Sequence, residues 1–168
     1  MRTIIQNGTI VSDTAAFRAD LLLEDGVVKA VGAGLSAPDA QVIDASGKYV
    51  LPGAVDVHTH MDLQAGAHRA VDDFYTGTVA AACGGTTTVF DYSGQAKGET
   101  LLETAKRREA EANEDGPAVD YALHVGITDL SNNLLDTMQE AVDYGISSFK
   151  VYMVYDFGVK DGDFYQVL

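Results

Sequence analysis

The first fifty residues alternate between short apolar runs and turn-forming residues, which predicts strands rather than helices. The six expected strands cover residues 3–5, 9–11, 21–23, 27–31, 41–43 and 49–51. Gln6-Asn7-Gly8 and Glu24-Asp25-Gly26 each separate two of these runs and predict hairpin turns. Residues 1–51 are therefore expected to form part of a small β-sandwich or barrel.

From residue 51 onward, runs of strand length alternate with segments of helical periodicity. The expected strands cover residues 53–59, 86–92, 119–127 and 146–154, and the expected helices cover residues 72–82, 99–113 and 131–144. This order predicts an α/β fold built from βαβ units with a parallel sheet. A closed (β/α)8 barrel needs about 250 residues, so residues 52–168 supply the first half of a TIM barrel. The apolar run at residues 164–168 is typical of the start of another helix, and we interpret the chain as part of a longer enzyme.

The composition limits the classes of partner that the protein is expected to bind. The chain is 46% hydrophobic and 21% charged, as expected of a globular protein, and its formal net charge of −14 disfavours binding to nucleic acid or to anionic membranes. The expected apolar runs are too short to span a membrane, and the N-terminus becomes polar too early for a signal peptide. Cys83 is the only cysteine, which favours a cytoplasmic location, and we expect it to be a small core residue.

Two histidines stand at the end of the strand that follows Leu51-Pro52-Gly53. Side chains alternate between the faces of a strand, so His58 and His60 should share one face at the exit of a buried strand. Two imidazoles so placed can converge on one metal ion. The alternative is a pair of polar residues that closes a strand; we favour the metal site.

Lys150 lies inside the apolar run predicted as the last strand. Burial of an ammonium group is costly, so such a lysine shifts toward its neutral amine or finds a partner. A neutral amine can act as a nucleophile or take up carbon dioxide as a carbamate. The alternative is a lysine whose head group reaches water at the strand end. Because catalytic groups of TIM barrels sit at the C-terminal ends of the strands, Lys150 and the two histidines together favour the functional interpretation.

These motifs carry a resemblance to a known family. Residues 51–60, which read Leu-Pro-Gly-Ala-Val-Asp-Val-His-Thr-His, resemble the opening signature of the amidohydrolase superfamily. Residues 72–78, 80–89 and 148–155 narrow the resemblance to the dihydropyrimidinase/D-hydantoinase family. The similarity runs over nearly all 168 residues.

The resemblance implies a metal-dependent hydrolase that acts on carbon–nitrogen bonds in cyclic amides. Two divalent ions, usually zinc, would be bound, with His58 and His60 on the more buried ion and carboxylated Lys150 bridging both. A hydroxide shared by the ions would open the ring of a dihydropyrimidine or hydantoin to an N-carbamoyl amino acid. Tyr155 matches the family tyrosine that donates to the developing oxyanion; its alternative is an aromatic residue packed at a strand end.

The resemblance also sets limits. Two further histidine ligands and an aspartate are expected downstream of these residues, so the 168 residues alone should be inactive. Gln64-Ala65 replaces the Pro-Phe common in the family, in a loop that helps, with residues 152–161, to shape the pocket for the substrate's exocyclic group. The substrate side chain and stereochemistry therefore stay open. The family implies a small-molecule substrate and a homotetramer.

Three alternatives remain. Allantoinase-like and dihydroorotase-like hydrolases share the superfamily pattern, but the dihydroorotase pattern has arginine where Asp62 stands. The third is a non-catalytic assembly protein related to dihydropyrimidinase. Such proteins lose metal ligands, whereas His58, His60 and Lys150 are all present.

Four other features are interpreted without a direct catalytic role. His124 is expected to be a packed core histidine or a residue that supports the metal ligands. His68 should be a solvated loop residue, and Asp91 either forms a local side-chain turn or supports the site. Gly84-Gly85 is expected to end a helix.

Overall fold

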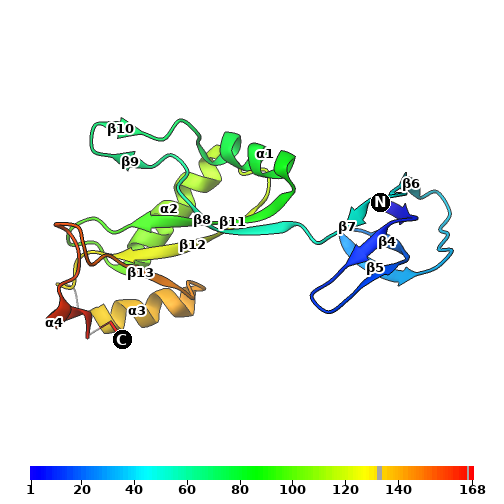
Figure 1. Ribbon diagram of the computed structural model, residues 1–168. Helices are drawn as coiled ribbons and strands as arrows, with labels where there is room; N and C mark the ends of the chain where they lie inside the picture. Colours follow the sequence, from blue (N-terminus) through cyan, green and yellow to red (C-terminus); the bar gives the residue numbers. More distant parts are fainter. Residues whose placement is uncertain (132–133, 166) are drawn as a thin grey trace. The chain divides into compact units, whose positions relative to one another are not determined.

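The computed structural model describes residues 1–131, 134–165 and 167–168. It divides into two compact units, Met1–Pro52 and Gly53–Leu168 (Figure 1). Among the described residues, no helix has the length and apolar character needed to cross a membrane.

The first unit, all of whose residues are described, is built from two small sheets. Its strands are β1 (Arg2–Gln6), β2 (Thr9–Val11), β3 (Ala16–Arg18), β4 (Asp20–Glu24), β5 (Val27–Gly32), β6 (Gln41–Asp44) and β7 (Tyr49–Val50). One sheet has the order β5-β4-β1-β6 and the other the order β3-β2-β7. The sequence did not predict β3, because its three exposed residues lack an apolar alternation.

One of the two predicted hairpins is confirmed. β4 and β5 pair in antiparallel fashion, with Glu24 opposite Val27. Asp25 and Gly26 between them have φ values of 51° and 81°. Positive φ at both central residues is what a two-residue hairpin turn of the primed type requires.

The other predicted hairpin, at Asn7-Gly8, is wrong. β1 pairs with β4 and β6, whereas β2 pairs with β3 and β7, so the turn carries the chain from one sheet to the other. The Asn7 N–H donates to Asp20 Oδ1 over 3.1 Å, and its side-chain amide donates to Asp44 Oδ1 over 3.0 Å. A Cβ on Gly8 would lie 2.6 Å from Val50 Cγ2, so close packing rather than strand pairing selects this glycine.

The second unit contains a parallel sheet whose strands lie in chain order. The strands are β8 (Ala54–Thr59), β11 (Thr86–Gly94), β12 (Asp120–Ile127) and β13 (Phe149–Val151), and the helices are α1 (Phe74–Gly84), α2 (Leu101–Asp115), α3 (Leu134–Tyr144) and α4 (Asp161–Phe164). The sheet order is β13-β12-β11-β8, with α1, α2 and α3 in the successive crossovers (Figure 1). Four consecutive parallel strands with a helix in each crossover are the arrangement of half of a (β/α)8 barrel, which agrees with the predicted fold class.

Capping residues mark the ends of α1 and the start of α2. Asp73 caps α1 by accepting from the Thr76 N–H over 2.7 Å, and Gly85 ends the helix with φ 90°. Thr100 and Glu103 form a capping box at the start of α2. These helices start within two residues of their predicted starts. The third predicted helix is described from Leu134, and residues 132–133 of that prediction lie outside the described residues.

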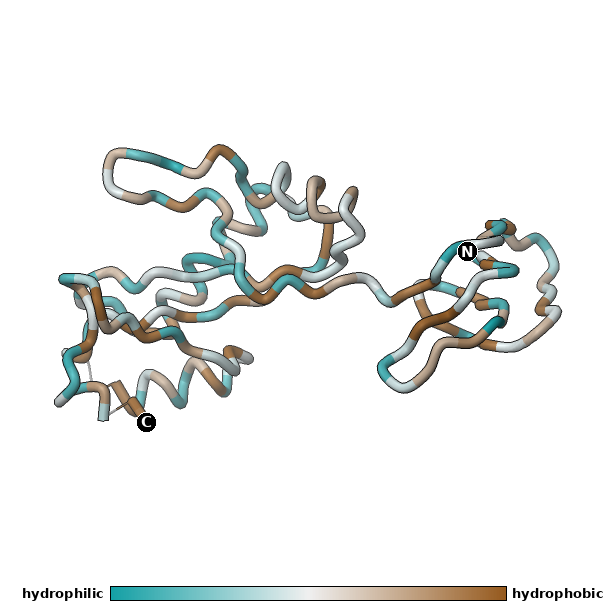
Figure 2. Tube along the Cα trace, in the orientation of Figure 1, coloured by the Kyte–Doolittle hydropathy of each residue, from teal (hydrophilic) through white to brown (hydrophobic). Residues whose placement is uncertain are grey.

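The core of this unit lies between β12 and the helices α2 and α3. Alternate β12 residues are buried against them, and Figure 2 shows the hydrophobic stretches along the central strands. The buried core residues are Leu101, Ala105, Leu123, Val125, Ile127, Leu134, Ala141, Ile146 and Val159. The β11 residues Asp91 and Ser93 face the helices, because they bond to α2, whereas the next position, Tyr92, faces the opposite side.

Several sequence predictions about this unit are wrong in detail. The last strand is only Phe149–Val151 instead of residues 146–154, because the chain turns after it: the Val159 N–H donates to the Tyr152 carbonyl over 2.7 Å. A small hairpin, β9 (Gln64–Ala65) with β10 (His68–Arg69), occupies a segment expected to be loop, although His68 is exposed as predicted. The expected final helix is instead α4, and residue 166 lies outside the described residues.

Two burial predictions are also wrong. β8 is an edge strand whose Val55 and Val57 are 55% and 59% exposed, because β11 alone pairs with it among the described strands. Cys83 is exposed on α1, where the buried positions lie in the first helical turns.

Candidate metal centre

His58 and His60 meet at the C-terminal end of β8. Their Nε2 atoms lie 3.2 Å apart, and their ring centroids are 5.1 Å apart with an interplanar angle of 72°. Two nitrogen ligands about 2.0–2.1 Å from one tetrahedral ion are themselves about 3.3 Å apart. The spacing of the two imidazole nitrogens therefore fits a shared ion.

The state of His60 also suits metal binding. Burial, with the positive charge of Lys150 acting in the same direction, lowers the pKa of the His60 imidazole below its ordinary value. A lowered pKa favours the neutral ring, which is the form that binds a metal. Nδ1 of His60 is buried and has no hydrogen-bond partner among the described residues. A buried polar atom without a partner is costly, and this one lies on the ring nitrogen opposite the Nε2 that faces His58.

Lys150 approaches the same place from β13, opposite Gly126 of β12. Its Nζ lies 4.0 Å from the centre of the Tyr92 ring and 5.0 Å from that of Tyr152. The Tyr92 ring in turn lies 4.7 Å from the His58 ring and 5.0 Å from the His60 ring. Tyr92 of β11 is thus in contact with both histidines and the lysine, and the sequence analysis did not predict a role for it.

A cavity of about 450 Å³ joins these residues to the predicted Tyr155. Its lining residues are His60, Leu63, Gln64, Ala65, Gly66, Tyr92, Gly94, Lys150, Tyr152, Tyr155 and Phe157. Tyr155 is 58% exposed, and its ring stacks on Phe157 with centroids 5.1 Å apart. It therefore belongs to an aromatic wall of the cavity and not to the packed core.

The described residues provide only part of a metal ligand set. No group of three or more histidine, cysteine, aspartate or glutamate side chains among them is placed to hold an ion. Two imidazoles leave at least two positions of a tetrahedral ion open.

Asp91 and Arg108 form a buried ion pair that the sequence analysis did not predict. Arg108 donates to Asp91 Oδ1 from Nε over 3.0 Å and from Nη2 over 2.6 Å. The second carboxylate oxygen accepts from the Met61 N–H over 2.7 Å. The interpretation of Asp91 as a local turn former is therefore wrong, because its partners lie far along the chain.

His124 is half-buried and bonded on both sides. Its Nε2 lies 3.1 Å from the Val57 carbonyl oxygen, and its Nδ1 pairs with Ser148 Oγ. Its ring lies 4.8 Å from that of Tyr92. This histidine connects β12 with β8 and with the segment before β13, beside the candidate metal centre.

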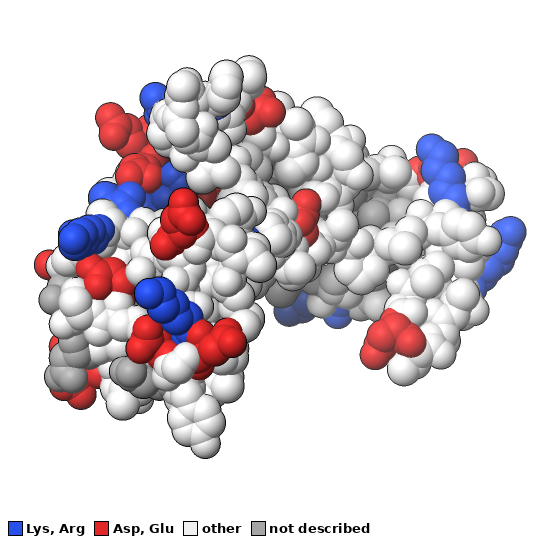
Figure 3. All heavy atoms as spheres, turned by 60° about the vertical axis from the view of Figure 1, so that its left-hand side comes forward, with Lys and Arg blue, Asp and Glu red and all other residues white. Residues whose placement is uncertain are grey.

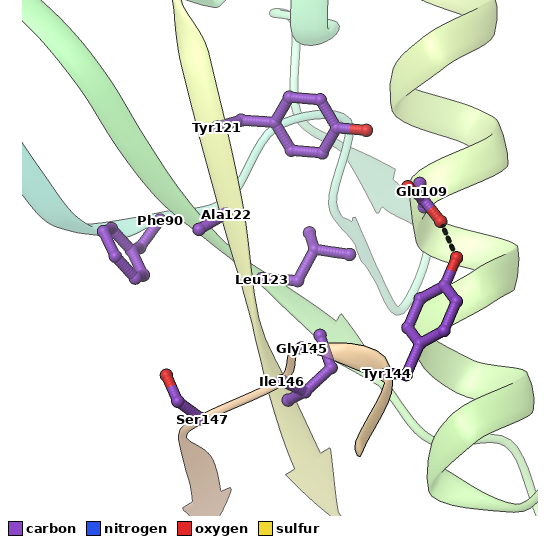
Figure 4. Close-up of a pocket in the computed structure, with 9 residues that line it drawn as sticks. All are labelled: Phe90, Glu109, Tyr121, Ala122, Leu123, Tyr144, Gly145, Ile146 and Ser147. Carbon is purple, nitrogen blue, oxygen red and sulfur yellow. Dashed lines mark hydrogen bonds between the residues drawn. The ribbon is translucent and has the colours of Figure 1, made fainter. Parts of the chain in front are cut away.

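A second cavity, of about 380 Å³, lies between β12 and the helices α2 and α3 (Figure 4). Phe90, Tyr121, Leu123 and Tyr144 are among its lining residues. The Tyr144 hydroxyl donates to Glu109, and that of Tyr121 donates to Asn113. None of the predicted site residues lines this cavity, and its phenols already have partners.

Charged residues over the described surface are mixed in sign. On the face shown in Figure 3, basic side chains lie beside acidic ones. Arg69 of the small hairpin pairs with Asp62, which precedes the hairpin, and Arg107 pairs with Glu99 over 2.9 Å.

The amino-acid sequence was compared with family models and with curated proteins. No family model matches the chain. It is 42% identical over 172 residues to a D-hydantoinase of Geobacillus stearothermophilus, covering 100% of this chain and 36% of that protein. It is 40% identical over 173 residues to a D-phenylhydantoinase of Escherichia coli, covering 100% of this chain and 37% of that protein.

Solved structures give the same result. A crystal structure of a D-hydantoinase superposes with a TM-score of 0.94 at 40% identity, over 99% of this chain and 37% of that one. A dihydropyrimidinase from Brevibacillus agri also gives 0.94, at 37% identity, over 100% of this chain and 37% of that one. The chain carries the first half of an α/β barrel with a small β-rich unit before it. Over its whole length it is similar to these hydantoinases and to this dihydropyrimidinase, as its motifs predicted, and it spans little more than a third of the length of the curated relatives.

Proposed function

We propose that the complete protein is a cyclic amidohydrolase that opens dihydropyrimidines or 5-substituted hydantoins to N-carbamoyl amino acids. The observation that carries the proposal is the 3.2 Å approach of His58 Nε2 to His60 Nε2, beside a cavity that Lys150 and Tyr155 also line. The relatives named D-hydantoinase and D-phenylhydantoinase support the substrate class.

Each of these side chains has a chemical task in the proposal. His58 and His60 would hold one divalent ion, expected to be zinc, through Nε2. The Lys150 amine would add to carbon dioxide and release a proton to water, and the resulting carbamate would supply oxygen ligands to the ions. When bound, such ions lower the pKa of water and polarise a carbonyl. The Tyr155 phenol would donate a hydrogen bond to the oxyanion that forms on the substrate.

The walls of the cavity would orient the substrate. Tyr152, Tyr155 and Phe157 form an aromatic side, and Gln64 and Ala65 of the small hairpin lie on its rim. Aromatic side chains offer large apolar surfaces, which suit an apolar exocyclic group on the substrate ring.

We also propose a cytoplasmic homotetramer in which residues 1–51 belong to a β-sandwich domain and residues 52–168 to the barrel. The two compact units, which divide at Pro52, support this domain assignment. Light scattering of the complete protein tests the assembly, and a monomer would contradict it.

Metal content and ring-opening activity of the complete gene product test the function. We expect about two metal ions per chain and hydrolysis of dihydrouracil or hydantoin in the wild type. Lys150→Ala should lose one or both ions together with the hydrolysis, whereas Lys97→Ala, on an exposed turn, should keep both. A metal-free, inactive wild type would contradict the proposal and favour a non-catalytic assembly protein.

A further inference from the structure

We propose that Asp91 and Arg108 are positioning residues that clamp the backbone around His60 and so orient its ring toward His58. The inference rests on the proposed metal site and adds to it the two side chains that hold a ligand in place. Neither residue lines the cavity, so an effect on the metal would be indirect, through side chains such as His60 that do line it.

The clamp bonds to the residues on both sides of His60. Asp91 Oδ2 accepts from the Met61 N–H over 2.7 Å and from Thr59 Oγ1 over 3.3 Å. Arg108 Nη2 donates to the Met61 carbonyl oxygen as well as to Asp91 Oδ1. Both polar groups of the Met61 backbone are thus held by one ion pair.

The side chain of Met61 is confined too. A Cβ added to Gly77 of α1 would lie 2.3 Å from Met61 Sδ, so the methionine packs directly against the helix. Together with the clamp, this contact fixes the peptide that follows His60.

His60 needs such support more than an ordinary ligand does. A metal-binding histidine usually donates its other ring N–H to a carboxylate, a carbonyl or water, which fixes the ring. His60 Nδ1 has no such partner among the described residues. Among the described residues its orientation depends on its backbone, on its contact with His58 and on the stacking of its ring with Tyr92, whose centroid is 5.0 Å away at an interplanar angle of 28°.

The Asp91–Arg108 ion pair is buried and has further contacts. Asp91 is fully buried and Arg108 is 7% exposed. The guanidinium also lies 4.6 Å from the centre of the Phe74 ring and donates to Glu111 over 2.9 Å. Each polar arm of Arg108 has a partner, as a buried charge requires.

The experiment compares Arg108→Lys and Asp91→Asn with the wild type of the complete protein. A lysine ammonium can stay with Asp91 but lacks the planar fork that reaches Met61 at the same time. Arg107→Lys is the matched control, since the same change is made one position away, on a side chain paired with Glu99 and Glu111 at the surface. Zinc affinity is measured by chelator competition, and the visible spectrum of the Co²⁺-loaded protein reports the ligand geometry.

We expect both clamp variants to bind zinc about 10–100-fold more weakly and to show an altered Co²⁺ spectrum, with the control unchanged. Folded variants that bind zinc within about twofold of the wild type, with its Co²⁺ spectrum, would overturn the inference. A wild type that binds no metal would overturn both the proposed function and this inference.

A measurement on the wild type alone covers the case in which the variants do not fold. Amide hydrogen exchange of Met61 should be slow, because its N–H is held inside the clamp. Exchange at the rate of an unprotected loop amide would overturn the inference.

Discussion

The Lys150 ammonium nitrogen lies 4.0 Å from the centre of the Tyr92 ring, directly beside the two histidines that the same ring contacts. A cation over an aromatic face is attracted by the ring quadrupole. One aromatic side chain on β11 therefore contacts both the histidines at the end of β8 and the lysine of β13.

Replacement of Tyr92 tests this relationship. Tyr92→Leu removes the ring that contacts both histidines and lies beside Lys150, so we expect weaker metal binding and lower activity of the complete protein. Tyr92→Phe keeps the face and should retain both. Metal content and turnover of the two variants are the measurements. Equal behaviour of the leucine and phenylalanine variants would contradict the role assigned to the ring.

Two adjacent leucines on α3 should differ sharply in their effect on stability. Leu134 is 6% exposed in the core, whereas Leu135 is 64% exposed. Leu134→Ala should therefore lower the free energy of unfolding by about 2–5 kcal/mol through lost burial and a cavity. Leu135→Ala should change it by no more than about 0.5 kcal/mol. Denaturant unfolding measures the free energy of unfolding of both variants. Similar losses would contradict the prediction, because they would show that Leu135 is covered as well as Leu134.

Gly53 is needed because β11 approaches it closely. A Cβ at this position would lie 2.1 Å from Thr87 Oγ1 and 2.7 Å from Thr87 Cβ. Gly53→Ala should therefore destabilise the protein by about 1–3 kcal/mol. Adding Thr87→Ala removes the nearest atoms and should restore part of the loss, so the double variant measures the coupling.

Gly84→Ala is the control for this prediction, because a Cβ there meets no atom within 4 Å. It lies near the end of α1, where alanine is a better helix former than glycine, and it should not destabilise. Unfolding midpoints of the three variants and the wild type give the comparison. A neutral Gly53→Ala would show that the start of β8 can move away from Thr87.

The stability of the protein should depend on Glu99 at acidic pH. Hydrogen bonding to the Arg107 guanidinium, with further bonds from the Ala96 N–H and Thr104 Oγ1, lowers the pKa of the Glu99 carboxyl from 4.5 to about 2. The unfolded chain binds the proton first, so the contribution of Glu99 is present above about pH 4.5 and is lost between about pH 4.5 and pH 2.

Thermal unfolding of the wild type and Glu99→Gln across this range measures the effect. We expect the wild type to be the more stable at neutral pH and the difference to shrink as the pH falls through that window. Glu114→Gln, an exposed charge change on α2, the helix that carries Arg107, should show no such convergence. A difference that stays constant from neutral pH to pH 2 would contradict the assignment.

Most elements of the barrel unit could be predicted from the sequence, because the signals are local. Asp73 and Thr100 cap helices within a few residues of themselves, and Gly85 ends α1 through its own backbone conformation. The alternation along β8 was enough to predict that His58 and His60 share a face. Each of these signals acts over one turn or a few strand residues.

The predictions that failed depended on partners distant in the chain. Asn7-Gly8 has the residues of a hairpin turn, yet β1 and β2 pair in different sheets, because their partners are chosen by the packing of the whole unit. The exposure of Cys83 and of β8 likewise depends on which elements cover them.

The sequence by itself determined the order of the strands and helices, their caps, the shared face of His58 and His60 and the resemblance to the hydantoinases. Only the tertiary structure decided that Tyr92 would contact both histidines and Lys150, and that Arg108 would reach Asp91 and Met61, which precede it by 17 and 47 positions. The physical reason is that periodicity and capping act between near neighbours in the chain, whereas buried ion pairs and ring contacts form where the packing of the sheet against its helices brings distant residues together.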